Sequence, residues 1–429
     1  MISFLICGII FWLYTYMTFM KERIFYPSII FSFMWGGVCI YTALILNGYG
    51  QHLFLKEYYV FHHMDTYMIY FTIVMLGGFY LAHSLKKHTY VNVSLMMNSN
   101  FINKILSKYK WIMWLNFFGG ILRMAVMISS VGVDSIMDYR LAANAMMMTS
   151  SLSVAGIIFK ITAYVQMLAN FYVGLYGLKT GIETLNFRKI LGIFILYAPT
   201  QMATGGRLFI LYFILFFFGA FLLGRGIALK QHKRKLLNLR ESRAIILSFI
   251  GLLSLVALVA VVRSGGISKD QETIVEKFAY VTEGMLATEY LMDYYPSGTY
   301  QFDLGKNTIG KLSTQYLSFR SYLNDHTKMS AIVVCLFTPL YLDFGYLGSL
   351  IFLFFFAFFA ESIAIKSLRK LTIINFCIYM VILKMFYESV MTPSIGANIP
   401  NYELIILFLL FYKLLFGKIQ KSTMPLASN

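Results

Sequence analysis

The sequence predicts an all-α fold, that of a polytopic integral membrane protein. Of its 429 residues, 59% are hydrophobic and only 13% are charged, whereas a soluble domain is about 25% charged. Apolar runs of about 20 residues, the length that crosses a bilayer as a helix, recur along the chain. One long polar stretch interrupts them. We therefore predict about eleven transmembrane helices with one large extracytoplasmic loop.

The predicted spans are the apolar runs long enough to cross a bilayer. They lie at about 2–20, 27–46, 65–84, 111–129, 153–177, 190–204, 207–224, 244–262, 346–365, 371–389 and 402–417.

These spans divide the chain into three parts. Residues 1–262 hold spans one to eight, residues 263–345 form the large loop, and residues 346–429 hold the last three spans and a cytoplasmic tail. The sixth and seventh spans are joined so tightly that we expect a hairpin around Gly205-Gly206-Arg207. Residues 329–342 are apolar but short and contain Pro339. This segment is predicted to be re-entrant or interfacial, beneath the loop.

The distribution of basic residues predicts the topology. The formal net charge is +17, and most Lys and Arg residues fall in alternate short connectors, with the densest block between Arg225 and Arg243. Short cytoplasmic connectors are enriched in these residues. We expect the N-terminus and the large loop outside and the C-terminus inside. The charge then serves topology against anionic lipid rather than nucleic-acid binding. The four cysteines lie in or beside apolar runs, so no disulfide framework is indicated.

The outside arginines are the candidate anion-binding residues. The chain has no phosphate-binding Gly-rich loop, no nucleophile elbow and no His-Glu-x-x-His. No Asp-x-Asp occurs on an outside loop, and the nearest acid pair, in Asp270-Gln271-Glu272, is insufficient by itself to predict a metal site. No cofactor is indicated. Arginine donates two hydrogen bonds to a phosphate and stays charged. We therefore expect arginines at the ends of different spans to converge on one anion, with snorkelling to headgroups as the alternative. They are Arg207, Arg263, Arg140 and Arg320.

A general base is the second requirement for transfer to a hydroxyl. The preferred candidates, in order, are Asp343, Glu283 and His326. The other acids of the loop that could serve are Glu276, Glu289, Asp293, Asp303 and Asp325. Asp343 stands in an apolar stretch, where an ionisable group is a functional candidate; its alternative role is a salt bridge that fixes the loop. Glu283 has the alternative of a solvated helix face.

Three other sets of polar residues have structural alternatives. Lys384 and Glu388 are four residues apart and could pair along one helix, or line an ion path. His62 and His63 are adjacent, cannot share a helix face, and are interpreted as structural. Tyrosines of the large loop could stack on sugar rings: Tyr290, Tyr294, Tyr295, Tyr300, Tyr316 and Tyr322.

The layout and three short motifs resemble a known family. The motifs are Asp138-Tyr139-Arg140, Gly205-Gly206-Arg207, and the run from Thr338 to Gly348, which contains Leu-Tyr-Leu-Asp-Phe-Gly-Tyr-Leu-Gly. Together with many spans and a late outside loop, they are similar to the bacterial O-antigen and capsule repeat-unit polymerases (Wzy type).

The resemblance implies a reaction, partners and a location. Such polymerases join oligosaccharide units carried on undecaprenyl pyrophosphate, at the periplasmic face of the inner membrane, without a metal. The family looks like the integral-membrane (GT-C) class of glycosyltransferases, so the resemblance implies a GT-C-like arrangement of the helices. Such polymerases work with a flippase and usually a chain-length regulator. Family arginines bind the lipid pyrophosphate, a role that falls here on Arg207 first, then Arg263 and Arg140, then Arg320.

Three other classes of protein are alternatives. An O-antigen ligase uses the same donor and is expected to need a paired loop Arg and His, for which Arg320 and His326 are the candidates close in sequence. A flippase is expected to show two similar halves and short loops. A membrane acyltransferase is expected to carry an intramembrane histidine.

Overall fold

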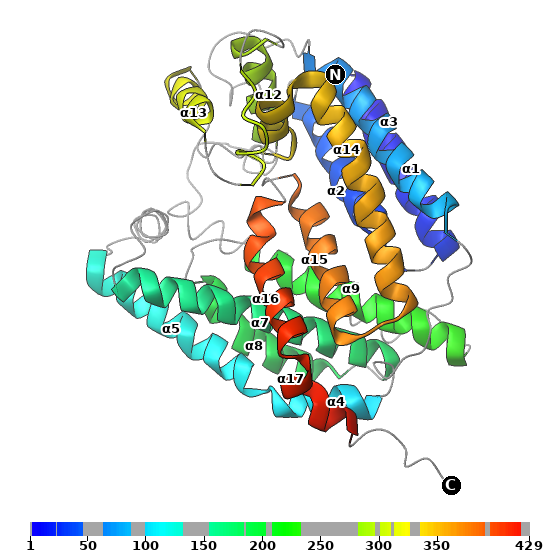
Figure 1. Cartoon of the computed structure of the whole chain (residues 1–429), viewed down its shortest axis with the longest axis vertical. Coiled ribbons are helices and arrows are strands. Elements are labelled where there is room, and N and C mark those ends of the chain that lie inside the picture. Colours follow the sequence, from blue (N-terminus) through cyan, green and yellow to red (C-terminus); the bar gives the residue numbers. More distant parts are fainter. Residues whose placement is uncertain are drawn as a thin grey trace, which may run out of the picture. The chain divides into compact units, whose positions relative to one another are not determined.

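The structure is a computed structural model of the 429-residue chain. It describes residues 2–22, 24–45, 63–86, 99–131, 154–183, 186–202, 208–232, 282–296, 301–309, 313–326, 335–390 and 395–421. Within these ranges the regular elements are helices, and no β-strand occurs (Figure 1). The predicted fold class is therefore confirmed for the described part of the chain.

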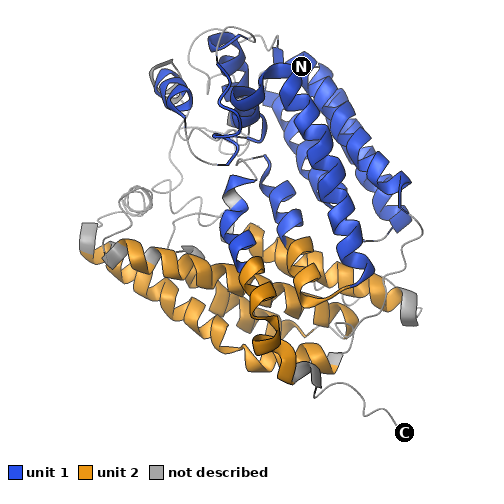
Figure 2. Cartoon of the chain, in the orientation of Figure 1, with its two compact units in different colours: residues 1–92, 271–370, 381–404 blue, residues 93–270, 371–380, 405–429 orange. Residues whose placement is uncertain are grey.

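The chain forms two compact units (Figure 2). Unit 1 comprises residues 1–92, 271–370 and 381–404, and unit 2 comprises residues 93–270, 371–380 and 405–429. Unit 1 therefore unites the first predicted spans with the described part of the large loop.

Four long helices build unit 1: α1 (Ile2–Glu22), α2 (Pro27–Leu44), α3 (His63–Ser84) and α14 (Phe337–Arg369). Their polar contacts fix their relative directions. Tyr67 and Ser349 are hydrogen-bonded at 2.8 Å near the start of α3, and His83 contacts Glu361 at 2.6 Å near its end, so α3 and α14 run parallel. Ser28 at the start of α2 also donates to Glu361, so α2 runs antiparallel to them. These relative directions are those that the predicted alternation of spans requires.

Aromatic side chains fill the centre of this four-helix group. They bury large apolar surfaces and meet mostly edge to face, an arrangement that favours their quadrupoles. Phe71 and Phe337 have ring centroids 4.3 Å apart, and Trp35 and Phe337 have centroids 4.7 Å apart. The core also includes Phe11, Phe31, Phe79 and Phe386. These ring contacts connect α1, α2, α3 and α14 within unit 1.

The large loop contributes α12 (Glu283–Tyr294) and α13 (Thr314–His326) to unit 1. The helix α12 packs against α3, α13 and α14. The helix α14 is broken at Gly345, which has φ 69° and ψ −171°. Only glycine adopts this conformation readily. The break separates a short first segment, Phe337 to Phe344, from the long apolar remainder of α14.

Unit 2 is a second group of helices. Its complete helices are α4 (Ser99–Lys108), α5 (Trp111–Val131), α7 (Val154–Ile182), α8 (Phe187–Met202), α9 (Leu208–His232) and α17 (Tyr412–Lys421). The helices α7 and α9 make the most extensive contact, and a Cβ at Gly224 would meet the carbonyl of Leu178, so this close approach requires glycine. Asn116 of α5 donates to two carbonyls of α8 beside Pro199.

Three helices complete the described chain near the C-terminus. They are α15 (Ile373–Glu388), the short 3-10 helix η5 (Gly396–Asn398) and α16 (Ile399–Leu410). In unit 1, Lys384 of α15 pairs with Glu388 at 3.1 Å, as the spacing of four predicted. Lys384 also donates to Asn398 at 3.2 Å, and Asn398 donates to Glu388 at 3.3 Å. The pair is thus enclosed in a buried polar network.

The predicted count of eleven spans is not confirmed. By length and composition, six described helices are able to cross a membrane, namely α1, α2, α3, α7, α9 and α14. The helices α8 and α15 have only 16 residues each, about 24 Å of helix against about 30 Å of hydrocarbon. The predicted last span is bent by 65° between α16 and α17, and the pair would be a seventh span if counted as one. The predicted span at 244–262 lies outside the described residues.

Candidate functional site

The candidate site lies where the loop helix α12 meets the first turn of α3. The first N–H groups of an α-helix have no partner within the helix, and the positive end of its dipole attracts an anion. Here the buried carboxylate of Glu289 accepts hydrogen bonds from the backbone N–H groups of His63, at 3.0 Å, and Met64, at 2.6 Å. A side chain of the large loop therefore caps α3.

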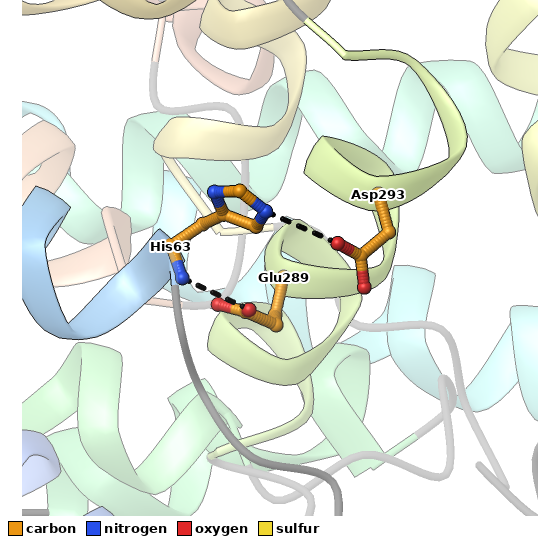
Figure 3. Close-up of side chains that lie close together, drawn as sticks. All are labelled: His63, Glu289 and Asp293. Carbon is orange, nitrogen blue, oxygen red and sulfur yellow. Dashed lines mark hydrogen bonds and ion pairs between the residues drawn. The ribbon is translucent and has the colours of Figure 1, made fainter.

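His63 completes a three-residue cluster with this carboxylate and a second one (Figure 3). Its Nε2 lies 3.2 Å from Oδ1 of Asp293, and both side chains are about half exposed. Glu289 and Asp293 are four residues apart, so they share one face of α12. One ligand atom from each of the three residues lies within 4.8 Å of the other two. Burial raises the pKa of the Asp293 carboxyl above its usual value.

An aromatic cluster lies at the C-terminal end of α12 and includes side chains of α13. The ring of Tyr294 lies 4.7 Å from that of Tyr295, 4.6 Å from that of Tyr322 and 6.1 Å from that of Phe319. Tyr294 is 42% exposed, although its ring has three aromatic neighbours. A held, partly exposed tyrosine offers an apolar face together with a polar hydroxyl. Such a surface suits the mixed apolar and hydroxylated faces of a sugar ring.

Asp343, the first predicted base, anchors the loop. Its Oδ1 accepts hydrogen bonds from the backbone N–H of Asn307 at 3.1 Å and from Nδ2 of Asn307 at 3.0 Å. Its Oδ2 accepts from the backbone N–H of Thr308 at 2.7 Å and from the Thr308 hydroxyl. A carboxylate offers about four lone-pair sites, so these four bonds occupy its capacity. The side chain is fully buried.

The geometry therefore favours a structural role for Asp343 over a catalytic one. The sequence offered a loop-fixing salt bridge as the alternative role, and the described partners of Asp343 are instead neutral donors of residues 307 and 308. The anchored turn contains Leu304 with φ 48° and Gly305 with φ 91°. A left-handed non-glycine residue such as Leu304 is costly unless its surroundings hold it. The hydrogen bonds of Asp343 supply that support.

The other predicted site residues lie on the loop helices α12 and α13 or outside the described residues. Glu283 is the first residue of α12, and Arg320 and His326 lie on α13. Arg320 and His326 are six residues apart, so these positions are not neighbours on the helix surface. Arg140, Arg207 and Arg263 lie outside the described residues, as does Gly205-Gly206-Arg207, the tip of the predicted hairpin. The two helices that the tip would join, α8 and α9, are described and contact each other.

Sequence reasoning missed His63 as a site residue. The adjacent pair His62-His63 was interpreted as structural because adjacent residues cannot share a helix face. That argument considers only partners on the same helix, whereas the partners of His63 come from α12. The available signal was the spacing of four between Glu289 and Asp293.

Comparison with known proteins finds no matching family model, no similar curated protein and no similar solved structure.

Proposed function

We propose that this protein polymerises undecaprenyl-pyrophosphate-linked oligosaccharide repeat units into O-antigen or capsular polysaccharide. The reaction would take place at the periplasmic face of the bacterial inner membrane. The observation that carries the proposal is the partly exposed aromatic cluster around Tyr294, next to the carboxylate of Asp293 on the large loop. Aromatic faces bind the C–H faces of sugars, and carboxylates accept hydrogen bonds from sugar hydroxyls.

The position of this cluster also supports a lipid-linked substrate. Within unit 1, α12 packs against α3 and α14, two helices apolar and long enough to span a membrane. It contacts the first turns of α3 and α14, so the helix that carries Asp293 and Tyr294 lies at one end of both. A substrate with a polyprenyl tail in the bilayer and its sugars outside it would meet the cluster there.

The pyrophosphate would be bound by the predicted arginines. Departure of the growing chain develops negative charge on the leaving pyrophosphate, and positioned guanidinium groups stabilise that charge. Arg320 lies next to Phe319 on α13, so its backbone belongs to the helix that carries part of the aromatic cluster. Arg207, Arg263 and Arg140 keep their predicted role. With Asp343 occupied in the loop, Glu283 and His326 remain the predicted bases.

The ligase alternative gains no support from α13. Its expected Arg–His pair would be Arg320 and His326, and a separation of six residues does not make neighbours on a helix. We propose the flippase and chain-length regulator of the same pathway as partners, and no nucleic acid.

Deletion and complementation in the host would test the proposal. The deletion is expected to leave a single repeat unit on the surface polysaccharide gel instead of a ladder. Wild type should restore the ladder, while Tyr294→Ala and Arg207→Ala should not, at equal protein levels in the membrane. Tyr80→Ala is the matched control, because Tyr80 lies on α3 and is 71% exposed. If the deletion also removes the single capped unit, the result would favour a ligase or a flippase over a polymerase.

A further inference from the structure

We propose that His63, Glu289 and Asp293 bind a divalent transition-metal ion. This inference goes beyond the proposed reaction and departs from the metal-independent chemistry that the family resemblance implies. The proposal concerns only the binding of the ion, which can be measured whatever the substrate of the protein is. Among the described residues, this is the group of histidine and carboxylate side chains whose ligand atoms converge closely enough for an ion.

The distances are those of a site that closes with small side-chain movements. Zinc binds imidazole nitrogen and carboxylate oxygen at about 2.0–2.2 Å, which places neighbouring ligand atoms a little over 3 Å apart. Nε2 of His63 and Oδ1 of Asp293 are already 3.2 Å apart. The remaining separations are at most 4.8 Å, so shifts of the half-exposed side chains of His63 and Asp293 toward the fixed Glu289 carboxylate would close the site.

The two carboxylates are held in place by their helix and by the cap. Glu289 and Asp293 project from consecutive turns of one face of α12, and the N–H groups of His63 and Met64 orient Glu289. A carboxylate oxygen has two lone pairs, so an oxygen that accepts one N–H can still bind a metal ion. In this arrangement the backbone of α3 positions one ligand and its first side chain supplies another.

The charges also favour a cation of this class. As metal ligands, two carboxylates would bring two negative charges to the ion, which offset the unfavourable positive end of the α3 dipole. Imidazole is a good ligand for zinc and related ions and a poor one for magnesium or calcium. Three protein ligands with two half-exposed side chains leave room for water or substrate oxygen in the remaining position. The ion would tie the loop to the start of α3.

Zinc competition on the purified full-length protein tests the site. Detergent-solubilised wild type, His63→Gln and Asp293→Asn would be titrated with Zn²⁺ against a chromophoric chelator, with Mg²⁺ in parallel. We expect one tightly bound zinc per wild-type chain and weak magnesium binding. Each variant should bind zinc at least about tenfold more weakly. Zinc should raise the Tm of the wild type and not that of the variants.

The same zinc titration includes a control variant and shows which results would contradict the proposed site. Glu183→Gln removes one carboxylate of unit 2 that pairs with Lys179, and it should bind zinc as the wild type does. The Tm values measured without metal show whether each variant folds, and the two variants alter different helices. A wild type that retains no zinc would overturn the site. So would variants that retain as much zinc as the wild type.

Discussion

The buried carboxylate of Glu289 accepts a hydrogen bond from the backbone N–H of Met64 at 2.6 Å, although 225 residues separate the two. This bond joins the large loop to the first turn of α3. It explains how a polar loop late in the chain becomes part of the same compact unit as the first spans. Its energetic contribution is open to direct measurement.

Glu289→Gln should lower the free energy of unfolding by about 1–2 kcal/mol. Glutamine keeps one oxygen acceptor but loses the negative charge at the helix N-terminus and the second acceptor for the N–H pair. Thermal or denaturant unfolding in detergent would measure the change. Glu183→Gln, on a carboxylate that is 37% exposed and lies 3.6 Å from Lys179, should change stability by less than about 0.5 kcal/mol. Equal stability of Glu289→Gln and wild type would contradict the capping role.

Asp343→Asn should destabilise the protein by about 2–3 kcal/mol, because the buried donors of Thr308 would face an amide N–H₂ group. Asp303→Asn is the matched control, since the side chain of Asp303 accepts from Asn307 at 2.9 Å and is only part-buried; it should cost less than about 1 kcal/mol. Polymer formation per folded molecule should persist in Asp343→Asn. A stable Asp343→Asn protein without polymer would instead restore Asp343 as a catalytic candidate.

Gly345→Ala should cost about 1–3 kcal/mol. The backbone at Gly345 has φ 69°, and an added Cβ would meet Cε1 of Phe302 at 2.9 Å. Gly192→Ala provides the comparison, because Gly192 lies on α8 with no heavy atom within 4 Å of its Cβ position. That substitution should stabilise the protein by about 0.5–1 kcal/mol. Opposite shifts of the unfolding midpoint in the two variants would support the break in α14, and parallel shifts would not.

Lys384→Met should cost about 3–5 kcal/mol, because it leaves Glu388 buried without its cation. The double variant Lys384→Met with Glu388→Leu should recover much of this loss, since both charges are then absent. Unfolding of the two variants in detergent gives the comparison. A double variant that is stable but inactive would favour the ion-path alternative for this pair.

Local patterns determined much of the fold. Apolar runs predicted the helices at the positions of α1, α2, α3 and α14, and the spacing of four predicted the Lys384–Glu388 pair. Both depend on residues that are close in the chain, where hydropathy and helix periodicity are sufficient. Hydropathy did not predict the 65° bend between α16 and α17 in the last predicted span, because it records apolar content and not the direction of the chain.

Only the tertiary structure decided which polar residues meet. The sequence predicted Asp343 as a general base because it lies in an apolar stretch. Its hydrogen bonds to residues 307 and 308 depend instead on how the loop turns back onto α14. His63 acquired its importance from α12, more than 200 residues later, through contacts with Glu289 and Asp293. The sequence alone therefore determined a helical membrane protein with a polar loop. The assembly of its candidate site depended on long-range packing, which no local pattern encodes.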